Sequence, residues 1–147
     1  MRTPALLLAV MLATLAPAQD KVIPPKEQIE QSAKKVKQLQ KERIATLKDL
    51  VDHAVAGYQN ARASYEEVFE AQILLLNAEL EAAEKESERI TLYKKLVDAL
   101  KAYEELANAQ KESGKGTATG VLKIKARRLE AEIHLEQAKV KEAKEIK

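Results

Sequence analysis

Residues 64–83 read SYEEVFEAQILLLNAELEAA, and residues 117–136 read TATGVLKIKARRLEAEIHLE. The second stretch repeats the first at a shift of 53 positions. A repeat of this size is usually one supersecondary unit used more than once. We therefore expect two copies of a chain reversal followed by an amphipathic helix. The aligned pairs include Ser64 with Thr117, Val68 with Val121, Phe69 with Leu122, Leu76 with Leu129, and Ala78-Glu79-Leu80 with Ala131-Glu132-Ile133.

Helix-breaking residues are confined to a few places, and Gly120 is the only one within the two stretches. All four prolines precede residue 26, and the four glycines are Gly57, Gly114, Gly116 and Gly120. Proline and glycine are the strongest breakers of helices, so their absence elsewhere permits very long helices. Aromatic residues make up only 3% of the chain, while 33% of it is charged. This composition favours coiled-coil-like packing.

A first helix is expected over residues 26–60, because its apolar residues recur at intervals of three or four and share one face. A short reversal follows. Ser64 then fits an N-cap, and Glu67 completes a capping box three residues later. The apolar positions expected on the stripe of this helix are Ile29, Ala33, Val36, Leu39, Ile44, Leu47, Val51, Ala54 and Tyr58.

A second helix is expected over residues 65–112 without interruption, which makes it roughly 70 Å long. The stripe of its first half contains Phe69, Ile73, Leu76 and Leu80. The stripe then rotates, because Lys94 and Lys101 occupy positions where a strict heptad repeat needs apolar residues. The two halves are therefore expected to face different helices. The second-half stripe consists of Ile90, Tyr93, Val97, Leu100, Tyr103 and Ala107.

A third helix is expected over residues 118–145. Gly114 suits a left-handed C-cap before it, and Thr117 suits its N-cap. Short reversals make consecutive helices antiparallel neighbours. The sequence thus predicts an all-α protein, an elongated antiparallel three-helix bundle with a very long central helix and its two turns at opposite ends. The side chains expected to be buried on the third helix are Leu122, Ala126, Leu129, Ile133 and Val140.

The N-terminal residues have the features of a targeting signal. Arg2 is followed by an apolar run at 5–15 and by the small-residue motif Ala16-Pro17-Ala18, which fits a secretory signal peptide at 1–18. An extended leader at 19–25 and a helical coiled-coil domain at 26–147 follow. With no cysteine in the chain, disulfides, thiolate metal sites and a lipoprotein anchor are excluded. We expect an exported, periplasmic protein, either soluble or associated with the outer membrane.

Charge and reactive residues indicate no catalytic chemistry. The 25 basic and 23 acidic residues alternate in sign, which is typical of a solvated helix and not of a nucleic-acid site. His53 and His134 lack a partner at metal-binding spacing. The GKGT at 114–117 lacks the spacing of a phosphate loop. We expect no enzyme, no cofactor and no metal site. A modest basic cluster is formed by Lys123, Lys125, Arg127 and Arg128, for which a surface role is the default and an anionic partner the alternative.

The reversal-plus-helix unit resembles the helical repeat of TolC-type outer-membrane efflux proteins. In that family a helix ends at a glycine, a serine or threonine follows three residues later, and an acidic-Val-Leu-x-Ala stretch leads into a helix rich in Leu, Ala and Glu. The similarity covers roughly 54–89 and 103–140. The second copy matches at Gly114, Thr117, Val121-Leu122 and 127–133, and the first at Ser64, 67–69, Ala71 and 74–80.

The resemblance implies that the two turns are periplasmic tips that meet the hairpins of periplasmic adaptor proteins. Ala61 replaces the family glycine, and Gly120 replaces the family acid. Residues 85–101 read as helix where the family places membrane-crossing strands, so the kinship concerns the hairpin and not the transport activity. We expect no membrane-spanning segment in the mature chain. The candidate contact residues at the tips are Ala61, Arg62, Ser64, Glu67, Gly114, Lys115, Gly116 and Thr117.

The sequence therefore leads to one main hypothesis of function and two alternatives. The main hypothesis is an exported, non-enzymatic helical protein that acts through protein–protein contacts in the cell envelope, with adaptor hairpins among the candidate partners. The first alternative is a periplasmic holdase-type chaperone or envelope spacer. The second is a component of an efflux or secretion assembly. Homo-oligomerisation stays open, because the apolar stripes could be closed within one chain or shared between chains.

Overall fold

The computed structural model describes residues 25–145, which form four α-helices and no strand. They are α1 (Pro25–Gln59), α2 (Tyr65–Ala82), α3 (Glu86–Glu112) and α4 (Ala118–Glu145). The all-α prediction is confirmed. Pro25 opens α1, where its fixed φ and missing N–H are tolerated. The expected signal peptide and, except for Pro25, the expected leader lie outside the described residues.

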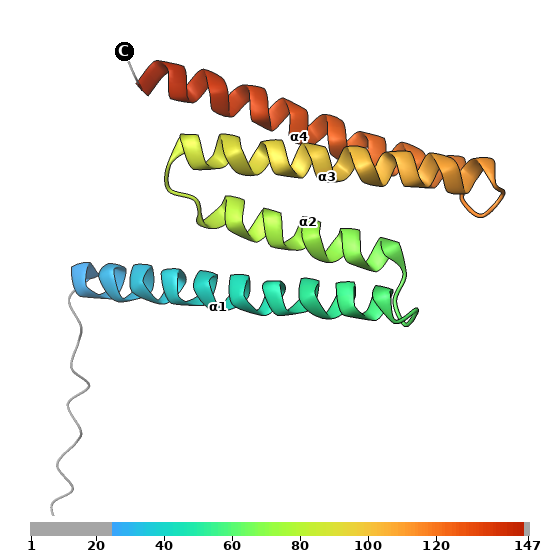
Figure 1. The fold of residues 1–147 in the computed structure, drawn as a ribbon. Coiled ribbons are helices and arrows are strands. Elements are labelled where there is room, and N and C mark those ends of the chain that lie inside the picture. Colours follow the sequence, from blue (N-terminus) through green and yellow to red (C-terminus); the bar gives the residue numbers. More distant parts are fainter. Residues whose placement is uncertain (1–24, 146–147) are drawn as a thin grey trace, which may run out of the picture.

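The helices run alternately up and down, and each packs against the next in sequence (Figure 1). The α1–α2 and α3–α4 reversals lie at one end of the molecule, and the α2–α3 reversal lies at the other (Figure 1). We call residues 60–64 the first tip and residues 113–117 the second tip. The expectation that the two tips lie at opposite ends is wrong.

The expected unbroken helix over 65–112 is also wrong, because the chain leaves the helical conformation between α2 and α3. Ala83 (φ −66°, ψ 125°) and Lys85 (φ −106°, ψ 140°) are extended. No proline or glycine marks this break. The Arg89 guanidinium stabilises it by donating two hydrogen bonds of 3.2 Å to the Ala83 carbonyl.

Packing accounts for the break. Folding back lets Phe69, Ile73 and Leu80 of α2 join a core with residues of α3 and α4, a contact that a straight helix cannot make with itself. Burial of a large apolar side chain is worth about 1.5–3 kcal/mol. Each backbone hydrogen bond lost at a break costs about 1 kcal/mol, so burial outweighs the interruption. The buried core residues of α3 and α4 are Leu96, Val97, Leu100, Tyr103, Ala107, Ile124 and Ala131.

Predicted and observed burial agree in α2 and α3. Phe69, Ile73 and Leu80 are buried, and Leu76 is half-buried against the core. In α4 the prediction fails, since Leu122, Leu129 and Ile133 are exposed. Ala126 and Val140 are exposed as well. The buried residues of α4 are instead Ile124, Ala131 and Ala138, on the opposite side of the helix.

The first helix is the peripheral element. Its backbone approaches only that of α2 among the described helices, and it has no buried residue. Ile44, Leu47, Val51 and Ala54 are half-buried. Lys37 pairs with Glu84 at 2.7 Å, just past the end of α2. The part of α1 before Lys37 therefore extends beyond α2 (Figure 1).

Candidate contact site at the helix tips

The first tip closes α1 with a Schellman motif, the common αL ending of a helix. Ala61 adopts a left-handed φ of 54°. The Gly57 carbonyl accepts from the N–H groups of Arg62 (2.8 Å) and Ala63 (3.2 Å), and the Tyr58 carbonyl accepts from Ala61 (3.0 Å). These bonds satisfy carbonyls that a helix end leaves without partners.

The start of α2 is held by the predicted capping box. The Ser64 hydroxyl accepts from the Glu67 N–H at 3.1 Å, and the Glu67 carboxylate accepts from the Ser64 N–H at 2.6 Å. Hydrogen bonding to the Ser64 backbone lowers the pKa of Glu67 below its ordinary value of 4.5. The box is therefore fully formed with an ionised Glu67 at neutral pH.

The second tip repeats this backbone geometry residue for residue. Gly114 has a left-handed φ of 74°, at the position equivalent to Ala61. The Gln110 carbonyl accepts from Lys115 (2.8 Å) and Gly116 (3.0 Å), as the Gly57 carbonyl does from Arg62 and Ala63. The Thr117 hydroxyl accepts from the Gly120 N–H at 3.0 Å, which confirms Thr117 as a cap. The sequence repeat is thus a repeat of structure.

One steric requirement links the two tips. A Cβ on Gly57 would lie 3.0 Å from the Cβ of Ala63. A Cβ on Gly116 would lie 3.1 Å from the Cβ of Gln110 and 2.9 Å from the Lys111 nitrogen. Gly57 is equivalent to Gln110, and Ala63 is equivalent to Gly116. At each tip, the last turn of the helix and the chain that follows it come close at one pair of residues, and one residue of that pair is glycine. At the first tip the glycine is in the helix, and at the second tip it is in the chain that follows.

The tips expose most of the predicted contact residues. Arg62 and Lys115 are exposed cations at equivalent positions, each directly after the left-handed residue. Gly116 is half-buried by its close approach to the end of α3. The other predicted tip residues, which are all exposed, are Ala61, Ser64, Glu67, Gly114 and Thr117.

A row of aromatic side chains, which sequence reasoning missed, leads from the first tip into the core. Tyr58 and Tyr65 are exposed, with ring centroids 5.2 Å apart. Tyr65 meets Phe69 edge-on at 4.7 Å, and Phe69 stacks on Tyr103 at 4.8 Å. The sequence did hold a signal for this row, because Tyr58 precedes the reversal by a few residues and Tyr65 and Phe69 follow it.

Tyr103 is fixed at the inner end of this row. Its hydroxyl donates to the Glu66 carboxylate at 2.9 Å. Burial, followed by this hydrogen bond, raises the pKa of Tyr103 well above its ordinary value, so the phenol stays protonated as a donor. Exposed tyrosine and arginine side chains on a rigid base are the residue types that dominate binding energy at protein interfaces.

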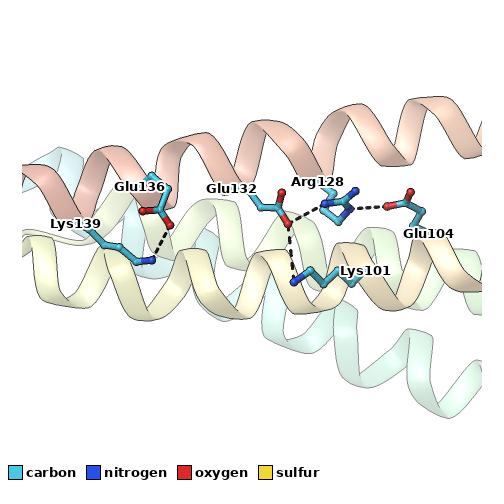
Figure 2. A network of polar contacts seen from close by, with 6 residues as sticks. All are labelled: Lys101, Glu104, Arg128, Glu132, Glu136 and Lys139. Carbon is cyan, nitrogen blue, oxygen red and sulfur yellow. Dashed lines mark hydrogen bonds and ion pairs between the residues drawn. The ribbon is translucent and has the colours of Figure 1, made fainter.

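Ion pairs attach α4 to the rest of the molecule, and they occupy half of the predicted basic cluster. Arg127 forms a bidentate pair with Glu70 of α2 at 2.6 and 3.2 Å. Arg128 pairs with Glu104 of α3 at 2.6 Å and with Glu132 at 2.8 Å (Figure 2). Lys123 and Lys125 remain exposed. Two residues of the cluster thus hold α4 against α2 and α3, and the other two keep the surface position that was expected.

Both histidines lie on exposed surfaces of their helices. His53 is exposed, and the ring of His134 stacks on Tyr93 with centroids 5.7 Å apart. Among residues 25–145, no group of three or more metal-ligating side chains is placed to hold an ion. None of the described helices is both long enough and apolar enough to cross a membrane.

Neither the protein-family models, nor the curated proteins, nor the solved structures compared with this chain match it.

Proposed function

We propose that this protein is a non-enzymatic helical protein of the cell envelope that binds partner proteins through its paired tips. The observation that carries the proposal is the presence of two geometrically equivalent tips at the same end of the molecule (Figure 1). Two matched sites on one rigid end can engage a partner together, and such bivalency raises the overall affinity without new contacts.

The side chains at this end support a protein partner. Arg62 and Lys115 offer one cation each at equivalent positions, and Tyr58 and Tyr65 add exposed aromatic area beside Arg62. A partner with acidic side chains on a helical hairpin suits this surface. The adaptor hairpins implied by the resemblance to TolC-type proteins belong to this class, as would other members of an efflux or secretion assembly. Export by the N-terminal signal is part of the proposal.

Site-specific photo-crosslinking in living cells tests it. A photoreactive residue replacing Arg62 or Lys115 should capture the same envelope protein, while one replacing Lys34, an exposed lysine on α1 distant in sequence from both tips, should not. Charge reversal at both tips (Arg62→Glu with Lys115→Glu) should abolish that capture. Reversal at Lys34 and Lys41 is the matched control. Equal capture from the tips and from Lys34, or no capture at all, would contradict the proposal.

A holdase or spacer role is a second candidate, because large apolar side chains are exposed on α4 and on the projecting part of α1. A holdase should suppress aggregation of a denatured test protein in proportion to its concentration. Replacing Leu129 by lysine should weaken that suppression. Unchanged aggregation in the presence of the parent protein excludes a holdase.

A further inference from the structure

The outward face of α4 bears an apolar stripe, interrupted once by Glu136, that no part of the described chain covers. It consists of Leu122, Leu129, Ile133 and Val140, which are 64%, 44%, 58% and 53% exposed, together with Ala126. The inward face of the same helix buries mainly smaller residues, Ala131 and Ala138 with Ile124. Four large apolar side chains of α4 are thus in contact with solvent, whereas Ile124 is buried and Val121 and Leu135 pack half-buried against the core.

The spacing of the stripe is that of a coiled-coil seam. Positions 122, 126, 129, 133, 136 and 140 alternate intervals of four and three residues, so they follow one line along the helix for roughly 27 Å. A groove beside it is lined by Leu129, Ile133 and Val140 and by the stems of neighbouring polar residues. Such a row accepts side chains of another helix between its own.

We infer that this stripe binds the same stripe of a second copy, in an antiparallel two-fold pair. The sequence of the stripe is self-complementary about the point midway between Leu129 and Ile133. One register sets Leu129 against the partner's Ile133, Leu122 against the partner's Val140, and Ala126 against the partner's Glu136. Every large apolar side chain then meets another, and the one acid meets the smallest residue.

Charge favours the antiparallel direction. Glu136 pairs with Lys139 of its own chain at 2.7 Å (Figure 2). In a parallel pair this carboxylate would still face the partner's Glu136 in the same layer of the seam, and like charges placed together across an interface are unfavourable. In the antiparallel register Lys125, which is exposed beside Ala126, lies next to the partner's Glu136. The symmetry makes this ion pair twice.

The acids close to the two-fold axis are compensated within their own chain. Glu132 is bound by Arg128 at 2.8 Å and lies 3.9 Å from Lys101 (Figure 2). Glu130 interacts electrostatically with Arg127. Their repulsion across the axis is therefore reduced before the two copies meet.

The opposite edge of the molecule does not offer a comparable stripe. The face of α1 turned away from α2 is polar and exposed, with Gln31, Lys35, Gln38 and Glu42 in succession. The apolar row on the side of α1 contains Ile29, Val36, Leu39 and Leu50, and Arg43, which pairs with Glu81, interrupts it between Leu39 and Leu50. A stripe that is complementary to itself leads to a two-fold pair and not to a ring.

The antiparallel pair has a consequence for the shape of the assembly. Because α4 of one copy runs opposite to α4 of the other, the tips of the two copies point to opposite ends. The dimer is then a two-ended rod with a pair of tips at each end. This inference does not depend on the proposed function of the tips.

Sedimentation equilibrium and single-cysteine crosslinking test the pairing on the full chain. We expect the mass of two chains for the parent and for Leu50→Lys, whose leucine is 44% exposed like Leu129. Leu129→Lys should weaken dimerisation roughly tenfold or more with unchanged helical circular dichroism, because it places a charge in the seam. A monomeric parent, or an unaffected Leu129→Lys dimer, would overturn the inference.

Disulfides between introduced cysteines show whether the two α4 helices run parallel or antiparallel. The chain has no cysteine of its own that could interfere. A mixture of Leu129→Cys and Ile133→Cys chains should oxidise mainly to the mixed dimer, because only paired Cα atoms come within about 4.4–6.8 Å. Predominance of Leu129→Cys self-crosslinks would show a parallel pair instead. A mass above two chains without either crosslink would show a head-to-tail assembly. Both results overturn the antiparallel pair.

Discussion

At the scale of single residues, the two tips solve the same backbone problem with different side chains. Both need a left-handed residue after the helix, and both need one glycine where the returning chain crosses the last helical turn. The first tip has alanine at the left-handed position and glycine in the helix. The second tip has glycine at the left-handed position and glycine on the returning chain.

The left-handed position gives the first prediction. Ala61→Gly should stabilise the protein by about 0.5–1 kcal/mol, because an L-residue loses about 1–2 kcal/mol in this region and glycine's greater unfolded-state freedom offsets part of the gain. Gly114→Ala should destabilise it by a similar amount. Urea denaturation followed by circular dichroism measures both. Destabilisation by Ala61→Gly would show that φ at Ala61 is not left-handed in solution.

The second prediction concerns the crossing at the first tip. Gly57→Ala creates a close Cβ–Cβ approach to Ala63, and Ala63→Gly removes it. The effect of Gly57→Ala should therefore be more favourable by about 1 kcal/mol in the Ala63→Gly background than in the parent, as expected for residues in contact. A double-mutant cycle of unfolding free energies measures this coupling. Simple additivity would contradict the geometry.

At the scale of the elements, burial decides where helices end and which face they turn inward. The break at 83–85 has no local breaker, and it exists because α2 and α3 cover one another. In α4 the burial of Ile124, Ala131 and Ala138 sets the rotation of the helix, and the ion pairs of Arg127 with Glu70 and of Arg128 with Glu104 agree with it. That rotation turns Leu129 and Ile133 outward.

The unequal burial of the elements gives the third prediction. The backbone amides of α1 should exchange with deuterium faster than those of α3, because α1 has no buried residue and contacts only α2. Within α1, residues 25–36 should exchange fastest, since they extend beyond α2. Hydrogen–deuterium exchange read by mass spectrometry resolves these segments. Protection of residues 25–36 equal to that of α3 would mean that another surface covers them.

At the scale of the whole molecule, the fold is a stack of two hairpins whose reversals coincide at one end. This arrangement follows from the break between α2 and α3, because an unbroken central helix would separate the tips by roughly 70 Å. Because both tips lie at the same end, one partner can contact them at the same time.

The fourth prediction measures this arrangement directly. Spin labels on Arg62→Cys and Lys115→Cys in one chain should give a distance distribution centred well below the roughly 70 Å of the unbroken helix. Labels on Arg62→Cys and Glu84→Cys, a site within the α2–α3 reversal at the opposite end, measure the length of α2 for comparison. A tip-to-tip distance near the longer value would contradict the four-helix fold.

The amino-acid sequence alone predicted the helical class, the ends of α1 and α4 to within about one residue, and the helix caps at both tips. These features depend on local interactions: the Ser64–Glu67 box, the left-handed Gly114 and the Thr117 cap involve residues within a few positions of each other. The repeat predicted a capped helix start at both tips, whereas the left-handed conformation of Ala61 was not predicted.

The number of helices, the common end of the tips and the exposed face of α4 depend on packing between residues distant in sequence. The residues at 83–85 are compatible with a helix, and they leave it because distant side chains gain more by packing together than the backbone loses. Both faces of α4 have apolar residues at intervals of three and four, so periodicity did not distinguish them. The sequence-based prediction therefore chose the face with the larger side chains as the buried one. Packing of Ile124 and Ala131 into the core, together with the ion pairs to Glu70 and Glu104 on other helices, selected the face that holds Ala131 and Ala138.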